Sequence, residues 1–371
     1  MISIGVMFLI LASFGVTVAQ ADTGWVRNSS NPVLVASSTG WDSGEVFGPR
    51  VYYDGSVYRM WYTGTTRLWR YRIGYATSTD GISWTKSKTN PVLSPGPPGS
   101  WGSNFTSSPS VIYNGSLYMM WYVGGQQPQP SEFYYYTFSG SLGFGLATSR
   151  DGITWTKYAG NPVMERTPID AFVMFDPWVL RVDNQFKMWY TCGSGAQLGV
   201  CNAASPDGIH WTKIPTAIFK GTGLRSDWDS GDVYSPNVFY DGHVYGMWYS
   251  GDRYINQTFS IHQIGYATSP DGITWTRAPG NPILGPSARG SWDSGNIDEQ
   301  GVVQVDGMFR LYYSGFADPK QNGPYKIGLA ESPAGFAIAE LSSPVLGAAV
   351  TLLIIAAVQV FRRRAPLTRL I

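Results

Sequence analysis

Residues 49–64 read Pro-Arg-Val-Tyr-Tyr-Asp-Gly-Ser-Val-Tyr-Arg-Met-Trp-Tyr-Thr-Gly, and this stretch decides the fold because the chain repeats it. Its Asp-Gly pair stands between two apolar runs, which is the strongest short-range signal for a β-hairpin. Related stretches recur about every 60 residues, at 109–124, 177–193, 236–251 and, in drifted form, 300–315. The aspartate or asparagine between the runs is therefore predicted to make a turn in each copy, not to catalyse.

A second repeated part follows each hairpin. Residues 73–84 read Ile-Gly-Tyr-Ala-Thr-Ser-Thr-Asp-Gly-Ile-Ser-Trp, and the pattern recurs around Trp155, Trp211 and Trp275. It predicts two more strands around another Asp-Gly turn, so each unit has four antiparallel strands, as a propeller blade does. The repeated Trp and Tyr residues are predicted to be core, because both faces of a blade press against neighbours.

The count of units predicts how the ring closes. The first part occurs five times, but the fifth copy stops near Gly335 with no following tryptophan. The missing outer strand matches residues 25–34, Trp-Val-Arg-Asn-Ser-Ser-Asn-Pro-Val-Leu. The sequence therefore predicts an all-β, five-bladed β-propeller over residues 22–337, closed by its N-terminal strand so that no sheet edge stays open.

The two ends of the chain predict a cell-surface protein. Residues 1–21 have the pattern of a secretory signal peptide, although the lack of Lys or Arg near Met1 leaves an uncleaved anchor open. After a linker at 338–344, residues 345–361 are apolar over the minimum length of a membrane helix. The basic tail, 362–371, begins with three arginines and is expected inside the cell, which places the propeller outside.

Composition limits the partners. Lys and Arg number 26 against 25 Asp and Glu, so no basic excess favours nucleic acid. Cys192 and Cys201 flank a short Gly-rich turn and are expected to form a cross-hairpin disulfide outside the cell. No zinc spacing and no phosphate-binding loop is present, so we predict no metal, no cofactor and a monomer. The histidines, His210, His243 and His262, are scattered over a strand, a turn and a loop.

Pattern and blade number together resemble the five-bladed propeller superfamily of glycoside hydrolases, which includes arabinanases, xylosidases, invertases and levansucrases. The resemblance covers residues 25–335 and rests on segments 73–84 and 264–275 with the Asn-Pro-Val-Leu or Asn-Pro-Ile-Leu that follows them. It implies carboxylates on the innermost strands that project into an axial pocket, one to protonate the leaving oxygen and another to act as base or nucleophile.

We compared the residues before the proline that opens each unit, where the innermost strand is expected to begin. The position immediately before it holds Gly48, Ser108, Asp176, Ser235 and Glu299, and the position four before the proline adds Glu45 and Asp232. Asp176, Glu299, Asp232 and Glu45 are thus the candidate catalytic acids, with Asp298 as a neighbour. The second unit offers no carboxylate here. Because Asp42, Asp229 and Asp293 recur in Trp-Asp-Ser-Gly loops, we expect them to be structural.

Aromatic insertions between the second and third strands of a unit provide candidate sugar-binding residues. They are Tyr134, Tyr135, Trp69 and Tyr254, which are expected on one common rim. Two hypotheses remain open. The first is a surface-anchored enzyme that hydrolyses or transfers glycosyl units of extracellular glycans. The second is a non-catalytic propeller that binds glycans or proteins through its rim.

Overall fold

The computed structural model describes residues 24–66, 70–126, 141–170, 173–193, 197–256, 259–317 and 324–334. The expected signal peptide, the apolar segment 345–361 and the basic tail lie outside these residues. No helix within the described part is long and apolar enough to cross a membrane.

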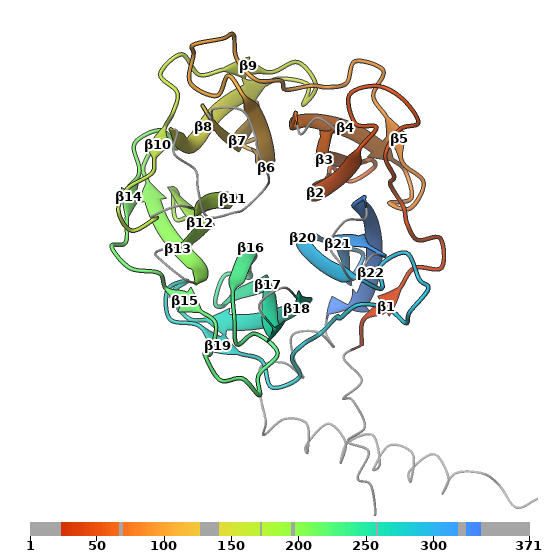
Figure 1. The fold of residues 1–371 in the computed structure, drawn as a ribbon. Coiled ribbons are helices and arrows are strands. Elements are labelled where there is room, and N and C mark those ends of the chain that lie inside the picture. Colours follow the sequence, from red (N-terminus) through yellow and green to blue (C-terminus); the bar gives the residue numbers. More distant parts are fainter. Residues whose placement is uncertain are drawn as a thin grey trace, which may run out of the picture.

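Five antiparallel sheets surround a central axis, which confirms the predicted propeller (Figure 1). The first blade comprises β2 (Glu45–Tyr53), β3 (Tyr58–Thr65), β4 (Arg72–Ser78) and β5 (Thr85–Lys86). The second comprises β6 (Phe105–Tyr113), β7 (Tyr118–Gly125), β8 (Leu142–Ser149), β9 (Thr156–Lys157) and β10 (Met164–Glu165). The third comprises β11 (Val173–Val182), β12 (Gln185–Gly193), β13 (Leu198–Ser205), β14 (Thr212–Lys213) and β15 (Phe219–Lys220).

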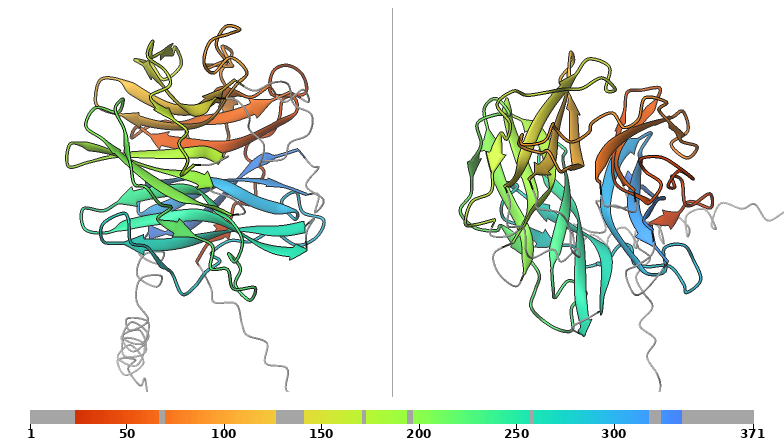
Figure 2. Two further views of the ribbon diagram at one scale, coloured as in Figure 1. Left: turned by 60° about the vertical axis from the view of Figure 1, so that its left-hand side comes forward. Right: turned by 45° about the horizontal axis from the view of Figure 1, so that its top comes forward.

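The last two blades complete the ring. The fourth comprises β16 (Val233–Tyr240), β17 (Tyr245–Asn256), β18 (Phe259–Ser269) and β19 (Thr276–Arg277). The fifth comprises β20 (Asn296–Val305), β21 (Met308–Phe316), β22 (Lys326–Pro333) and β1 (Val26–Arg27). In the side views of Figure 2 each blade is a twisted sheet packed against its neighbours.

The N-terminal strand closes the ring as predicted. Val26 of β1 pairs with Glu331 of β22, and Leu34 forms a further bridge with Ile327. The Arg27 side chain also binds Asp293, which precedes the fifth blade. The last blade therefore takes its outer strand from the start of the described chain.

The predicted turns and core are also confirmed. Asp54 Oδ1 accepts hydrogen bonds from the amides of Ser56 and Val57, so this side chain builds its turn. Trp61 is fully buried, and its indole N–H donates to the Gly152 carbonyl of the next blade at 2.9 Å. The same bond recurs from Trp121 and Trp189 to the glycine carbonyls of the blades that follow them.

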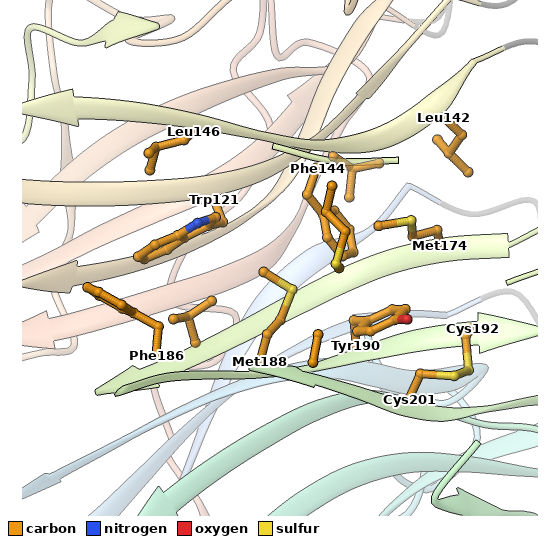
Figure 3. Close-up of a cluster of buried hydrophobic side chains, with 14 of the residues drawn as sticks. Trp121, Leu142, Phe144, Leu146, Met174, Phe186, Met188, Tyr190, Cys192 and Cys201 are labelled. Carbon is orange, nitrogen blue, oxygen red and sulfur yellow. A yellow bond between two sulfur atoms is a disulfide. The ribbon is translucent and has the colours of Figure 1, made fainter. Parts of the chain in front are cut away.

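Figure 3 shows the packing between the second and third blades, where Phe144 meets Tyr190 edge-on. The predicted Cys192–Cys201 disulfide lies at the border of this cluster and joins β12 to β13. Both cysteines are buried. The interface between the two blades is thus apolar, and the disulfide cross-links two strands within the third blade.

The Trp-Asp-Ser-Gly aspartates serve the fold, as expected. Each is buried and pairs with a basic residue of an outer strand and with a core tyrosine: Asp42 with Lys86 and Tyr62, Asp229 with Arg277 and Tyr249, Asp293 with Arg27 and Tyr313. Asp170 pairs in the same way with Lys213 and Tyr190 in the third blade. We call this contact of a buried aspartate with a basic residue and a core tyrosine an aspartate latch. The second blade has Gly102 after its loop tryptophan instead, and its Lys157 binds the Ser94 carbonyl.

Candidate active site on the propeller axis

The position before each unit's proline adopts one unusual conformation in all five blades. Gly48, Ser108, Asp176, Ser235 and Glu299 have φ between 47° and 58°. Each lies at a bulge in its innermost strand, where pairing skips two residues. The innermost strands therefore begin about four residues before the proline, which corrects the expected start. Their bulges aim equivalent side chains at a common region.

A ring of hydroxyl groups joins the bulges of neighbouring blades. The Gly48 amide donates to Ser314 Oγ at 2.9 Å, and the Ser108 amide donates to Thr63 Oγ1 at 3.0 Å. The amides of Ser235 and Glu299 bind Thr191 and Ser250 in the same way. Each hydroxyl comes from the second strand of the preceding blade, so the bulges are held around the axis by direct contacts between blades.

Asp176 accepts three hydrogen bonds from hydroxyl groups. Ser108 Oγ lies 2.9 Å from Oδ1, while Ser235 Oγ and Thr191 Oγ1 lie 2.7 and 3.2 Å from Oδ2. The two serines occupy the equivalent bulge positions of the blades on either side. Their contacts hold the Asp176 carboxyl group between the two neighbouring bulges.

Glu299 lies in a contrasting environment. Burial raises the pKa of its carboxyl group well above the usual range, and the charges of Asp176 and Asp298 raise it further. Its Oε2 is buried with no hydrogen-bond partner among the described residues. Gly48 leaves room for it, because a β-carbon there would stand 3.3 Å from Oε2. Burial and the neighbouring acids therefore favour the protonated form of Glu299.

Arg50 is the cation beside this pair. Its guanidinium group is buried, donates to the Gln300 carbonyl at 2.8 Å and lies 4.8 Å from the ring centroid of Trp178. Burial lowers the pKa of Arg50 to about 10, against the charges of Asp176 and Glu299. Arg50 therefore stays positive at neutral pH and offsets part of the acidic charge.

Glu45 belongs to the same acidic group. Burial raises its pKa to about 7, the charge of Asp298 adds to this, and a backbone hydrogen bond from Tyr325 opposes it. Its charge also acts on Glu299. The structure thus brings Asp176, Glu299 and Glu45 together with Asp298.

Asp232 belongs to a second cluster beside the axis, although it shares the register of Glu45. Its Oδ1 accepts from the Leu198 amide at 2.7 Å, and its own amide donates to Asp252 Oδ1. Asp252 faces His262, whose ring also approaches Asp298. His262 lies in β18 and not in a loop, which corrects the sequence expectation.

Aromatic side chains accompany the acids one residue before the bulge. Phe47, Phe175 and Tyr234 occupy this position in three blades, where the other two carry Ser107 and Asp298. Phe47 contacts Tyr71 and Tyr325, with ring centroids 5.6 and 5.9 Å apart. The sequence comparison missed these aromatics because it covered the bulge position and the position four before the proline. The position one residue before the bulge, where three of the five copies carry an aromatic residue, would have revealed them.

The predicted aromatic rim is described only in part. Trp69, Tyr134 and Tyr135 lie outside the described residues. Tyr254 lies in β17, which extends to Asn256, so it is part of a strand and not of the expected connection.

A hollow of about 200 Å³ lies beside Cys192 and Lys220, between β12 and the segment around Ala217. Within the described ranges, no three His, Cys, Asp or Glu side chains are grouped to hold a metal ion.

Comparison with known proteins gives distant relatives. No protein-family model matches the chain. The uncharacterized protein Rv1502 of Mycobacterium tuberculosis is 26% identical over 273 residues, which is 71% of this chain and 85% of that protein. The β-1,2-mannobiose phosphorylase of Thermoanaerobacter sp. (strain X514) is 26% identical over 136 residues, 34% of this chain and 44% of the enzyme.

Solved structures share the architecture. One glycoside hydrolase has a TM-score of 0.65 at 19% identity and covers 81% of this chain and 90% of its own. Another solved structure has a TM-score of 0.60 at 18% identity and covers 86% of this chain and 95% of its own. It is described as showing that the GH130 family of mannoside phosphorylases contains glycoside hydrolases that target β-1,2-mannosidic linkages in Candida mannan. The chain is a five-bladed β-propeller with structural neighbours in glycoside hydrolase families.

Proposed function

We propose that this chain cleaves or transfers glycosidic bonds at the propeller axis, with Glu299 as the proton donor and Asp176 as its carboxylate partner. The observation that carries the proposal is the contrast between two neighbouring carboxyl groups. Partial burial and neighbouring acids favour the protonated form of Glu299, whereas Asp176 accepts hydrogen bonds from three hydroxyl groups. A pair of acids in different protonation states is what acid–base cleavage of a glycoside requires.

The roles follow from this difference. Glu299 gives its proton to the glycosidic oxygen as the bond to the anomeric carbon breaks, so the leaving sugar departs as an alcohol. Asp176 then either removes a proton from the attacking water or attacks the anomeric carbon itself. Arg50 limits the repulsion between the two carboxylates after Glu299 has lost its proton, because its charge acts on both.

We propose a β-mannoside as the first substrate to test. The support is that the Thermoanaerobacter relatives are a β-1,2-mannobiose phosphorylase and a 1,2-β-oligomannan phosphorylase. Partly buried Phe47, Phe175 and Tyr234 add apolar surface around the acids, and such surface suits the faces of a sugar ring.

We further propose that the enzyme works on glycans outside the cell, held to the membrane by residues 345–361. The support is in the sequence alone, in the apolar run, the arginines that follow it and the leader-like start.

A second candidate is a propeller that binds glycans without cleaving them. The observation that favours it is in the second blade, whose bulge position carries Ser108 and not an acid. Ser108 donates a hydrogen bond to Asp176 there and adds no third carboxyl group to the site. It needs the aromatic side chains but not the proton on Glu299.

The experiment measures release of free sugar and of sugar 1-phosphate by the purified full chain from β-1,2-mannobiose, β-mannans and a panel of other polysaccharides, with and without inorganic phosphate. Glu299→Gln and Asp176→Asn remove one acid each. Asp54→Asn is the matched control, because it gives the first blade's turn the residue that the second blade carries at Asn114.

Release that both axial variants lose by about 10²-fold or more, and that the control keeps, would support the proposal. Release that survives in both would remove these acids from the chemistry. Binding of a mannan without release from any substrate would support the second candidate.

A further inference from the structure

The cluster around His262 joins two tyrosine hydroxyls at the side of the axial acids. His262 Nδ1 lies 2.7 Å from Tyr234 Oη and 3.3 Å from Asp298 Oδ2. Tyr325 Oη donates to the same Asp298 oxygen at 3.3 Å. Tyr234 precedes a bulge residue, and Tyr325 contacts Phe47, which precedes another. Both tyrosines therefore lie next to residues of the bulges or in contact with their neighbours.

The hydrogen bonds form a consistent set only when both ring nitrogens of His262 carry protons. Nε2 lies 2.7 Å from Ser260 Oγ, and the Ser260 hydroxyl is itself a donor to Asp252. Nδ1–H then donates to Tyr234 Oη, which leaves the tyrosine proton for Asp298. If His262 lost one proton, Tyr234 or Ser260 would have to donate to the ring and would release its carboxylate.

The surrounding charges support the imidazolium. Asp298 of β20, Asp252 of β17 and Asp232 before β16 raise the pKa of His262, although burial opposes them. The remaining titratable groups that face the cluster are Tyr234, Tyr325 and, through Asp298, Glu45 and Glu299. The described cluster therefore places three acids around the His262 ring, which favours its protonated form.

We propose that His262 is a positioning residue that fixes the Tyr234 hydroxyl and, through Asp298, the Tyr325 hydroxyl, so that the two bind neighbouring hydroxyl groups of a sugar unit at the axis. This inference rests on the proposed function for its substrate, but not for its geometry. Both tyrosines are partly exposed, and each offers a ring face and a phenolic oxygen, a combination that suits a sugar. His262 would thus help to select which sugar is bound.

The first test does not depend on activity. The full chain has three histidines, of which His210 and His243 are exposed, so their ring C–H signals can be followed by NMR through a pH titration. The signal missing from His262→Gln is expected to titrate clearly above the ordinary value of about 6.5, and Tyr234→Phe should shift it. A His262 that titrates at or below that value would overturn the imidazolium and the proposal with it.

The second test separates binding from chemistry. His262→Gln and Tyr234→Phe are expected to raise KM about 10-fold and to change kcat by less than about 3-fold, because the lost hydroxyl contacts serve binding. In the parent, KM should rise as pH passes the value at which His262 titrates. His243→Gln is the control. A fall in kcat at constant KM would overturn the positioning role, and Tyr234→Phe decides the matter if His262→Gln does not fold.

The two proposals fail differently. If the chain cleaves no glycoside, the proposed function fails while the NMR titration still reports on the cluster. If cleavage is found and both variants keep the parent KM, only the role of His262 fails.

Discussion

Glu299 of the fifth blade lies against Gly48 of the first, so that Oε2 is 3.3 Å from the point where a β-carbon on Gly48 would stand. The same bulge position holds serine in the second and fourth blades, where both hydroxyls donate to Asp176. Glycine at this one place therefore leaves Glu299 without the donor that Asp176 receives. The two acids therefore differ in the hydroxyl donors that their neighbours in the ring provide.

Gly48→Ser should give Glu299 such a donor. The backbone can accept serine, because Ser108 and Ser235 adopt nearly the same φ. A hydroxyl bond to the ionised form lowers the pKa of Glu299, so the alkaline limb of the pH–rate profile should move to lower pH. Gly48→Ala is the control and should leave the limb in place. Equal shifts in both variants would contradict the hydrogen-bond explanation.

Glu45→Gln should stabilise the protein at alkaline pH. Because the folded-state pKa of about 7 lies above the usual 4.5, the folded state binds the proton more tightly, and stability falls as pH rises from 4.5 to 7. Glutamine does not ionise, so the variant does not lose this stability as pH rises. The free energy of unfolding from urea titrations should exceed that of the parent by up to about 3 kcal/mol at pH 8 and match it at pH 4. An equal difference at both pH values would contradict this.

The second blade provides a test of the aspartate latches. Lys213→Met leaves buried Asp170 without its cation, which should cost about 3–5 kcal/mol of unfolding free energy. Lys157→Met is the comparison, because Lys157 binds the Ser94 carbonyl and takes part in no aspartate latch among the described residues. Burial already lowers the pKa of Lys157. Its loss should therefore cost about 1 kcal/mol of unfolding free energy. Similar losses in both variants would show that the latch adds nothing beyond packing.

Reduction of the Cys192–Cys201 bond should lower stability moderately. The cysteines are nine residues apart, and a loop of this size stabilises by about 2–3 kcal/mol in the chain-entropy model. Dithiothreitol should therefore lower the urea midpoint of the parent, while the Cys192→Ala, Cys201→Ala double variant should be insensitive to it. A midpoint that falls equally in both proteins would indicate an effect of the reductant elsewhere.

The fold was predictable because its signals are local and repeated. Asp54 and Asp80 make turns with amides two and three residues away, so the sequence around them contains the whole interaction. Trp25 could be assigned to the last blade because it repeats a segment that the last copy lacks. The same repetition identified Asp42 as structural.

The site was predictable only where one blade departs from the others. Asp176 and Glu299 differ from Gly48, Ser108 and Ser235 at the bulge, so the comparison of copies could select them as candidates. Arg50 and His262 were missed because their partners come from other parts of the ring. Arg50 meets Trp178 and Gln300, while His262 meets Asp298 and depends on the long β17–β18 hairpin. Asp232 shares the register of Glu45, yet Asp252 on the neighbouring strand draws it into another cluster.

The pairing of β1 with β22 also has a consequence for synthesis of the chain. Asn28 bonds to Glu331, 303 residues later, and ribosomes add about 5–20 residues each second. The first strand therefore waits about 15–60 s for its partner. During this time four blades can form, but the ring stays open and its terminal sheet edge is free to pair with another chain. Chaperone protection of the nascent chain, or translocation before the last blade is made, would meet this need.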